Sequence, residues 1–79
     1  MTRQDIEAKI EAIVREQLDL REYDKDTPLT DWAVDSLDCI EMVMAMEEEF
    51  GIEIYDDKAE AMDTPADAID YLAKRLKVR

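Results

Sequence analysis

The 79-residue chain contains no histidine, and this absence removes the usual partner of a catalytic nucleophile. A serine or cysteine nucleophile is normally activated by an adjacent base, most often an imidazole. Asp35 and Asp38, the charged residues nearest to Ser36 in the sequence, are poor bases at neutral pH. A zinc site would also lack its ligands, because the chain offers no imidazole and one thiol. We therefore expect neither an enzyme nor a metal site.

Cysteine, glycine and proline are equally scarce. Cys39 is the only cysteine, so no disulfide can form within the chain. One glycine and two prolines are too few for the many turns of a β-sandwich or barrel, whereas the content of Ala, Glu, Leu, Ile and Met favours helices. No segment approaches the roughly 18 apolar residues of a membrane span, and the N-terminus has no apolar signal core. These absences predict a cytoplasmic, all-α protein.

Basic residues are few as well, and the excess of acid is concentrated in one region. The net charge is −12, and residues 35–60 contain ten acids but only one base, Lys58. Such a field repels nucleic acid and anionic membranes, and it attracts basic partners. Because the charge coincides with an apolar stripe described below, we expect a basic partner surface in preference to a role in solubility alone.

Apolar spacing and capping residues predict four helices. A capping box formed by Thr2 and Asp5 is followed by apolar residues at helical spacing, which gives a helix at about 3–18; these residues are Ile6, Ile10, Ile13, Val14 and Leu18. A second helix at about 36–50 begins after Asp35 and ends at Gly51. A short third helix at about 56–62 follows the Ile52–Ile54 connector. A fourth at about 65–77 begins with Thr64, Pro65 and the acid of another capping box, Asp67.

The expected fold is a small four-helix bundle, with three long helices and one short helix, in a single domain over residues 1–79. A long connection from Asp19 to Asp35 lacks periodicity. A loop of this length in a small bundle is either functional or held by its own side chains. Leu29 and Trp32 are the side chains expected to hold it, with Trp32 packed on the bundle beneath the loop. We expect a monomer.

The helix at 36–50 has two apolar faces. At about 100° per residue, one stripe comprises Met42, Cys39, Met46, Phe50 and Val43, which is the width of a core face. This position predicts a buried, inert Cys39. The second stripe comprises Leu37, Ile40 and Met44, and it is flanked by acids. A bundle this small can cover one face well, so the second stripe is expected to be at least partly exposed, as in protein–protein sites. The alternative is that the long loop folds over it.

Ser36 stands at the head of this helix and allows two interpretations. It could act only as a helix cap, which is the usual role of serine in such a position. It could also be a substrate whose hydroxyl another enzyme derivatises. The long loop before it, the apolar stripe after it and the acids around it favour the second interpretation.

The segment D-S-L-D at 35–38, with M-A-M-E-E-E-F beginning eight residues after Ser36, closely resembles the acyl carrier proteins of dissociated fatty acid synthesis. The similarity runs from about Thr27 to Leu72. The resemblance implies a 4′-phosphopantetheine arm on Ser36, transferred from coenzyme A by a Mg²⁺-dependent phosphopantetheinyl transferase. Acyl groups would be carried on the terminal thiol of this arm as thioesters. Asp35 corresponds to the acid that members of the family place near the metal of the transferase.

The resemblance also implies a partner-recognition helix and an acyl-binding interior. The residues that match the recognition helix, which would meet basic docking patches on acyl synthases and transferases, are Leu37, Asp38, Ile40, Glu41, Met44, Glu47 and Glu48. Acyl chains would enter between helices, where Met42, Met46 and Met62 form an adaptable interior. The chain departs from the family pattern at Ala33, where glycine is usual, at Tyr55, where proline is common, and in a first loop about three residues shorter.

Three alternatives remain beside the fatty acid carrier. A carrier of a specialised pathway, such as polyketide or lipopeptide synthesis, would have the same architecture. A non-catalytic interaction or assembly module would use the helix at 36–50 as its contact and Ser36 as a cap. A calcium-binding protein is suggested by Asp24, Asp26 and Asp31, but an EF-hand loop starting at Asp24 would have Leu29 where glycine is needed.

Overall fold

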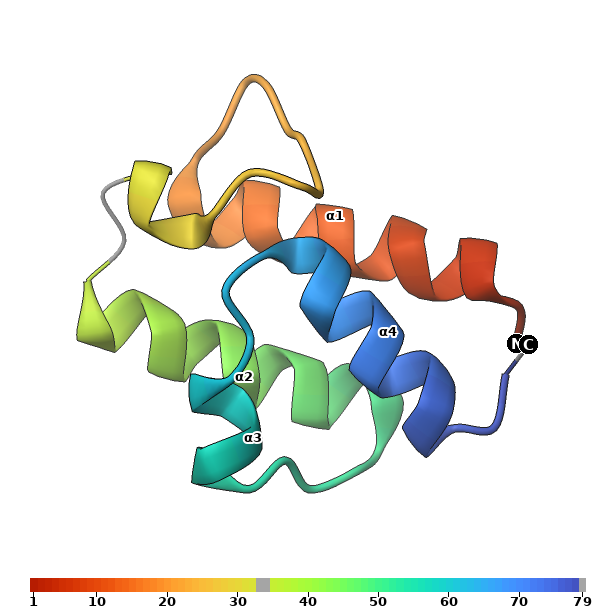
Figure 1. The fold of residues 1–79 in the computed structure, drawn as a ribbon. Helices are drawn as coiled ribbons and strands as arrows, with labels where there is room; N and C mark the ends of the chain where they lie inside the picture. Colours follow the sequence, from red (N-terminus) through yellow and green to blue (C-terminus); the bar gives the residue numbers. More distant parts are fainter. Residues whose placement is uncertain (33–34, 79) are drawn as a thin grey trace.

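The computed structural model describes residues 1–32 and 35–78, which form a helical bundle with no strand among them (Figure 1). The elements in chain order are the helix α1 (Arg3–Leu18), the 3₁₀ turn η1 (Leu29–Trp32) and the helices α2 (Ser36–Phe50), α3 (Asp56–Glu60) and α4 (Pro65–Arg75). The helix α1 packs against both α2 and α4. The all-helical architecture with four α-helices agrees with the fold class expected from the sequence.

A capping box starts each of the three long helices. In each box the side chain of the N-cap residue accepts a hydrogen bond from the backbone N–H of the residue three positions later. The carboxylate of that later residue accepts a hydrogen bond from the backbone N–H of the N-cap residue. The pairs are Thr2 with Asp5, Asp35 with Asp38, and Thr64 with Asp67. Gly51 ends α2 with φ +65°, a left-handed conformation that glycine adopts without strain. Local sequence therefore determines these helix ends.

The core lies where α1, α2 and α4 meet. Its most buried side chains are apolar, and among the described residues no polar or charged residue is buried as a whole. The core members are Ile6, Ile10, Val14, Met42, Met46, Ile54, Ala68, Ile69, Leu72 and Ala73. On α1, α2 and α4 these positions recur at three- and four-residue spacing, as expected for one buried helix face, and Ile54 joins them from the connector after α2.

Two helices end earlier than the pattern indicates. The α3 helix stops at Glu60 because its last turn tightens: Ala61 and Met62 donate to carbonyls three residues back, and Met62 turns toward the core. The α4 helix stops at Arg75 because Lys77 adopts φ +57° and the Val78 N–H donates to the Ala73 carbonyl at 2.7 Å. This arrangement closes the helix with a Schellman motif.

The connection between α1 and α2 is fastened to the core and to the start of α4. Leu29 and Trp32 are half-buried and pack against the core, and Trp32 stacks on Tyr23 with ring centroids 6.2 Å apart. The Leu29 N–H donates to the Asp63 carbonyl at 2.8 Å, and the Ala66 N–H donates to the Lys25 carbonyl at 2.8 Å. These bonds join the connection to the start of α4.

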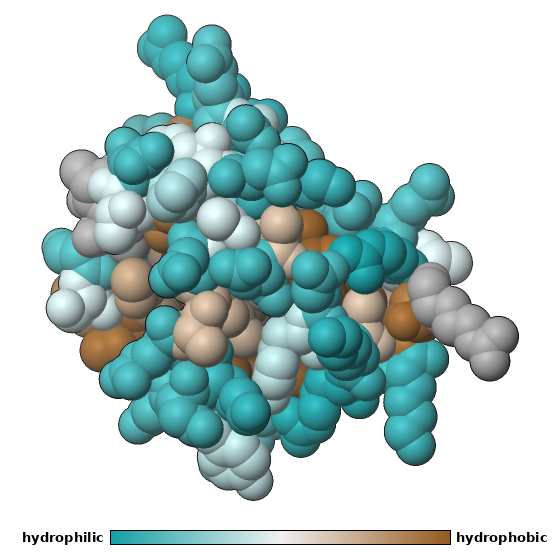
Figure 2. Space-filling model, in the orientation of Figure 1, coloured by the Kyte–Doolittle hydropathy of each residue, from teal (hydrophilic) through white to brown (hydrophobic). Residues whose placement is uncertain are grey.

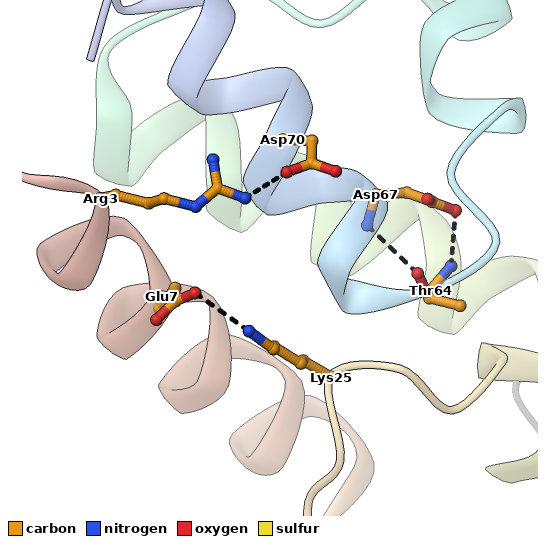
Figure 3. A network of polar contacts seen from close by, with 6 residues as sticks. All are labelled: Arg3, Glu7, Lys25, Thr64, Asp67 and Asp70. Atoms are coloured by element: carbon orange, nitrogen blue, oxygen red, sulfur yellow. Dashed lines mark hydrogen bonds and ion pairs between the residues drawn. The ribbon is translucent and has the colours of Figure 1, made fainter. Parts of the chain in front are cut away.

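Exposed ion pairs add to these attachments. Lys25 pairs with Glu7 of α1 at 3.3 Å, and Arg3 of α1 pairs with Asp70 of α4 (Figure 3). Pairs this exposed contribute little stability individually. Their position shows that the connection and α4 approach the same side of α1.

Candidate functional site

The α2 helix presents one face to the core and another to solvent. Met42 and Met46 are 2% and 6% exposed, whereas Leu37, Ile40 and Met44 are 61%, 56% and 60% exposed. The prediction of two separate apolar faces is therefore confirmed, and the alternative that the long loop covers the second face is wrong. We call Leu37, Ile40 and Met44 the apolar strip. Hydrophobic areas of limited size also interrupt the mainly hydrophilic surface in the view of Figure 2.

The acids beside the apolar strip have almost no basic neighbours. Glu41 and Glu48 are exposed, and Asp38 and Glu47 are half-buried. Among the described residues, the only acid of α2 that pairs with a basic side chain is Glu49, which bonds to Lys9. The negative potential along the strip is therefore not neutralised by ion pairs among the described residues, and it favours the approach of a basic surface.

Ser36 is exposed at the first position of α2, and its neighbour Asp35 caps the helix in its place. The Asp35 Oδ1 atom accepts the Asp38 N–H at 2.8 Å, and the Asp38 Oδ2 atom accepts the Asp35 N–H at 3.4 Å. The Ser36 hydroxyl has no hydrogen bond with any residue that the structure describes. The interpretation of Ser36 as the helix cap is therefore wrong. Ser36 is also the only serine in the chain.

A groove of about 690 Å³ begins at Ser36 and runs between α2 and α3. This volume lies in the range that small ligands and cofactors occupy. Its lining residues are Ser36, Cys39, Ile40, Val43, Met44, Glu47, Glu53, Ile54, Asp56, Ala59, Glu60 and Met62. An apolar bottom and acidic edges therefore continue from the serine along the helix.

A smaller apolar cavity of about 50 Å³ lies next to the groove, inside the bundle. It is lined by core residues that include Met42 and Met46. Cys39, Val43, Ala59 and Met62 line both spaces and so form the wall between them. Methionine side chains are unbranched and adapt their shape readily, so the three methionines Met42, Met46 and Met62 make this interior deformable.

Cys39 lies at the surface, which corrects the prediction of a buried thiol. The helical wheel assigned it the direction of the core, but a wheel carries no information on depth along the axis. Cys39 is in the first turn of α2, one turn before Met42, the first deeply buried residue of the helix. Partial burial and the nearby Asp38 and Asp35 carboxylates raise the pKa of its thiol, so the uncharged form predominates at neutral pH.

Other expected features have mixed outcomes. The Asp24 carboxylate accepts the Asp26 N–H at 2.9 Å, and no group of three or more Asp, Glu or Cys side chains is arranged to hold a metal within residues 1–32 and 35–78. The calcium-site alternative therefore gains no support.

In the same part of the chain, no helix combines the length and apolar character needed to cross a membrane. Tyr55 is exposed. Ala33 lies outside the described residues.

The sequence pattern did not identify the α3 side of the groove. Glu53, Asp56 and Glu60 line it opposite α2. The high acid content of residues 53–60 was a usable signal, because it continues the charge of α2 beyond Gly51. The pattern also assigned Glu47 only to partner contact, although its carboxylate accepts the Ile54 N–H at 2.8 Å. No sequence signal indicates that bond.

The exposed hydroxyl, its free position beside a helix cap and the adjoining groove suit a residue that receives a flexible group from another protein. A model of the phosphopantetheine attachment site family matches residues 8–72, well over half of the chain. Domains of this family bind 4′-phosphopantetheine covalently and act as carriers that meet a phosphopantetheinyl transferase and acyl-handling enzymes. The chain therefore belongs to the phosphopantetheine attachment site family and is a carrier protein.

Proposed function

We propose that the chain is the acyl carrier protein of a dissociated fatty acid synthesis pathway and that Ser36 is its attachment residue. The observation that carries the assignment is the exposed Ser36 hydroxyl, which makes no hydrogen bond to the described residues because Asp35 caps the helix. A groove with an apolar bottom begins at the same residue. These features fit a residue that holds a long, flexible arm.

The chain contributes the Ser36 hydroxyl that accepts the arm, and the transferase contributes the catalytic groups. Attachment forms a bond between the Ser36 oxygen and the phosphorus of the arm and releases the nucleotide part of coenzyme A. No histidine is available to take the hydroxyl proton, so the transferase supplies the base and the Mg²⁺ ion. The positive end of the α2 dipole favours the resulting phosphate. Asp35 lies beside Ser36, where its carboxylate can approach the metal of the transferase.

The attached arm supplies a terminal thiol on which acyl groups are carried as thioesters. The chain's own residues then provide docking and shelter. The apolar strip offers contact area, and Asp38, Glu41, Glu47 and Glu48 attract basic patches on acyl synthases and transferases. Steering of this kind raises the association rate more than the affinity, so a complex can form quickly and still dissociate. A shuttle between enzymes needs both properties.

Fatty acid synthesis in the cytoplasm is the pathway we propose, because the segment from Ser36 to Ile54 resembles those carriers most closely. Tyr55, an exposed aromatic residue where that group commonly has proline, favours a specialised acyl pathway as the second candidate. The acyl thioester found on protein isolated from its source distinguishes the two.

Attachment at Ser36 is tested by incubating the protein with coenzyme A and a broad-specificity phosphopantetheinyl transferase, and then measuring its intact mass. We expect an increase equal to one arm in the wild type and no increase in Ser36→Ala. Thr30→Ala is the matched control, because Thr30 is another exposed hydroxyl near the start of α2 and its removal should leave labelling unchanged. Unlabelled wild type, or labelled Ser36→Ala, would refute the assignment.

The docking proposal has a separate test in the kinetics of the same reaction. If acids beside the apolar strip steer the transferase, the second-order rate constant should fall as ionic strength rises from about 20 to 500 mM. Replacing Glu41 and Glu48 together by glutamine should reduce that salt dependence. An interaction module that needs no arm would bind its partner equally well before and after modification.

A further inference from the structure

One peptide group in the connector between α2 and α3 is bonded at both of its ends by charged side chains. The Ile54 N–H donates to the Glu47 Oε2 atom at 2.8 Å. The Glu53 carbonyl, which belongs to the same peptide group, accepts from the Arg75 guanidinium at 2.9 Å. The carboxylate comes from α2 and the guanidinium from α4. This peptide group therefore links the two helices across the connector.

These bonds hold a residue that forms part of both the core and the groove. Ile54 is 4% exposed, and it also lines the groove. Bonds to charged partners are roughly twice as strong as neutral ones, and a peptide group polarised from both ends strengthens each bond. The Glu47 backbone carbonyl also accepts the N–H groups of Gly51 and Ile52. Glu47 thus sets the path of the connector from its first residue to Ile54.

The Glu47 carboxylate also lies in the groove between α2 and α3, where a docking partner can contact it. Glu47 lines the groove together with Glu53, Asp56 and Glu60, and no basic residue is among the lining residues. The groove is therefore acidic along its edges and apolar along its bottom. A lysine or arginine side chain combines an apolar stem with a cationic head, and so matches both parts.

We propose that the groove receives a lysine or arginine side chain of a docking partner, which pairs with Glu47 in place of the Ile54 N–H. Docking then releases the Glu53–Ile54 peptide group on its α2 side and loosens the groove at Ile54. The change extends toward Ala59 and Met62, which follow the connector and separate the groove from the inner cavity. This inference rests on the proposed docking function and assigns Glu47 a second role in it, as the residue that converts docking into opening.

The bond itself is tested by amide hydrogen exchange on the unmodified protein. Glu47→Ala should accelerate exchange at Ile54 by about tenfold or more, because a charge-assisted bond is lost. Glu47→Gln keeps an acceptor oxygen and should produce a smaller acceleration. Glu48→Ala removes the same charge one residue away and should leave Ile54 unchanged. Equal exchange in Glu47→Ala and Glu48→Ala would overturn the proposal, and Glu47→Gln provides the comparison if the alanine variant does not fold.

Displacement by a cation is tested with a synthetic helical peptide that presents lysines beside leucines, and with the same peptide carrying glutamine in place of lysine. Saturation with the lysine peptide should accelerate Ile54 exchange several-fold in the wild type and produce no further change in Glu47→Ala. Failure of the lysine peptide to bind, or binding with unchanged or slower Ile54 exchange, would show that the proposal is wrong. Neither measurement involves the arm, so a failure of Ser36 labelling would not affect the result.

Discussion

The carboxylate of Asp35 caps α2 at 2.8 Å from the Asp38 N–H, and the hydroxyl of its chain neighbour Ser36 has no hydrogen bond to the described residues. Asp35→Ala should therefore lower the free energy of unfolding by about 1 kcal/mol, the usual effect of losing a cap. Ser36→Ala should change it by less than about 0.5 kcal/mol. Urea unfolding of the unmodified proteins measures both values. A loss for Ser36→Ala that equals the loss for Asp35→Ala would contradict this division of roles.

Truncation of Met44 should weaken partner binding, whereas truncation of Met46, two residues later in α2, should lower stability. Met44 is exposed, so Met44→Ala should change stability by less than about 0.5 kcal/mol while raising the KM of the transferase for the carrier. Met46 is buried, so Met46→Ala should lower stability by about 2–5 kcal/mol. Thermal unfolding and initial-rate kinetics separate the two effects. A drop of several degrees in the melting temperature of Met44→Ala would assign Met44 to the core.

Cys39 is accessible but should react slowly with alkylating agents at neutral pH. Burial, followed by Asp38 and Asp35, raises the pKa of its thiol above the ordinary value of 9.0, and only the thiolate reacts quickly. The alkylation rate by iodoacetamide should thus rise with pH, with a midpoint above that of a cysteine in a short unstructured peptide. Asp38→Asn removes a negative charge and should move that midpoint downward. A wild-type midpoint at or below that of the peptide cysteine would disagree with this environment.

Tyr23 contains a buried hydroxyl that finds no hydrogen-bond partner among the described residues. Burial, reinforced by Glu11 and Glu7, raises the pKa of Tyr23 to about 12, so the phenol is uncharged at neutral pH. Phenylalanine preserves the stacking on Trp32 and the contact with the Arg15 guanidinium, 5.7 Å from the ring centre. Tyr23→Phe should leave stability unchanged or increase it by up to about 1 kcal/mol, as measured in urea. A loss above about 1 kcal/mol would indicate that the hydroxyl has a partner.

Much of the bundle follows from local patterns in the sequence. The capping pairs and Gly51 mark helix ends through interactions within a few residues, and apolar spacing selects Ile6 and Ile10 for the core. The apolar strip was also predictable. A small bundle has too few elements to cover two faces of one helix, so surplus apolar residues on α2 had to remain exposed.

The parts that were not predictable depend on contacts between distant residues. The helical period predicts the direction of the Cys39 side chain, but its exposure to solvent depends on where the bundle ends. The bond from Glu47 to Ile54 spans seven residues through a connector of irregular path, and the bond from Arg75 to Glu53 spans 22. The helical periodicity of the sequence predicts neither of these two bonds. The groove between α2 and α3 has the same origin, since its shape depends on how the connector is held.

The two backbone bonds from the loop before α2 to residues 63 and 66 have a consequence for synthesis on the ribosome. The partners of this loop are made only about 30 residues after the serine itself is incorporated. A nascent chain that ends before Asp63 lacks both anchors. The connection that precedes the acceptor hydroxyl therefore cannot take up these attachments until about 30 residues beyond Ser36 have been made.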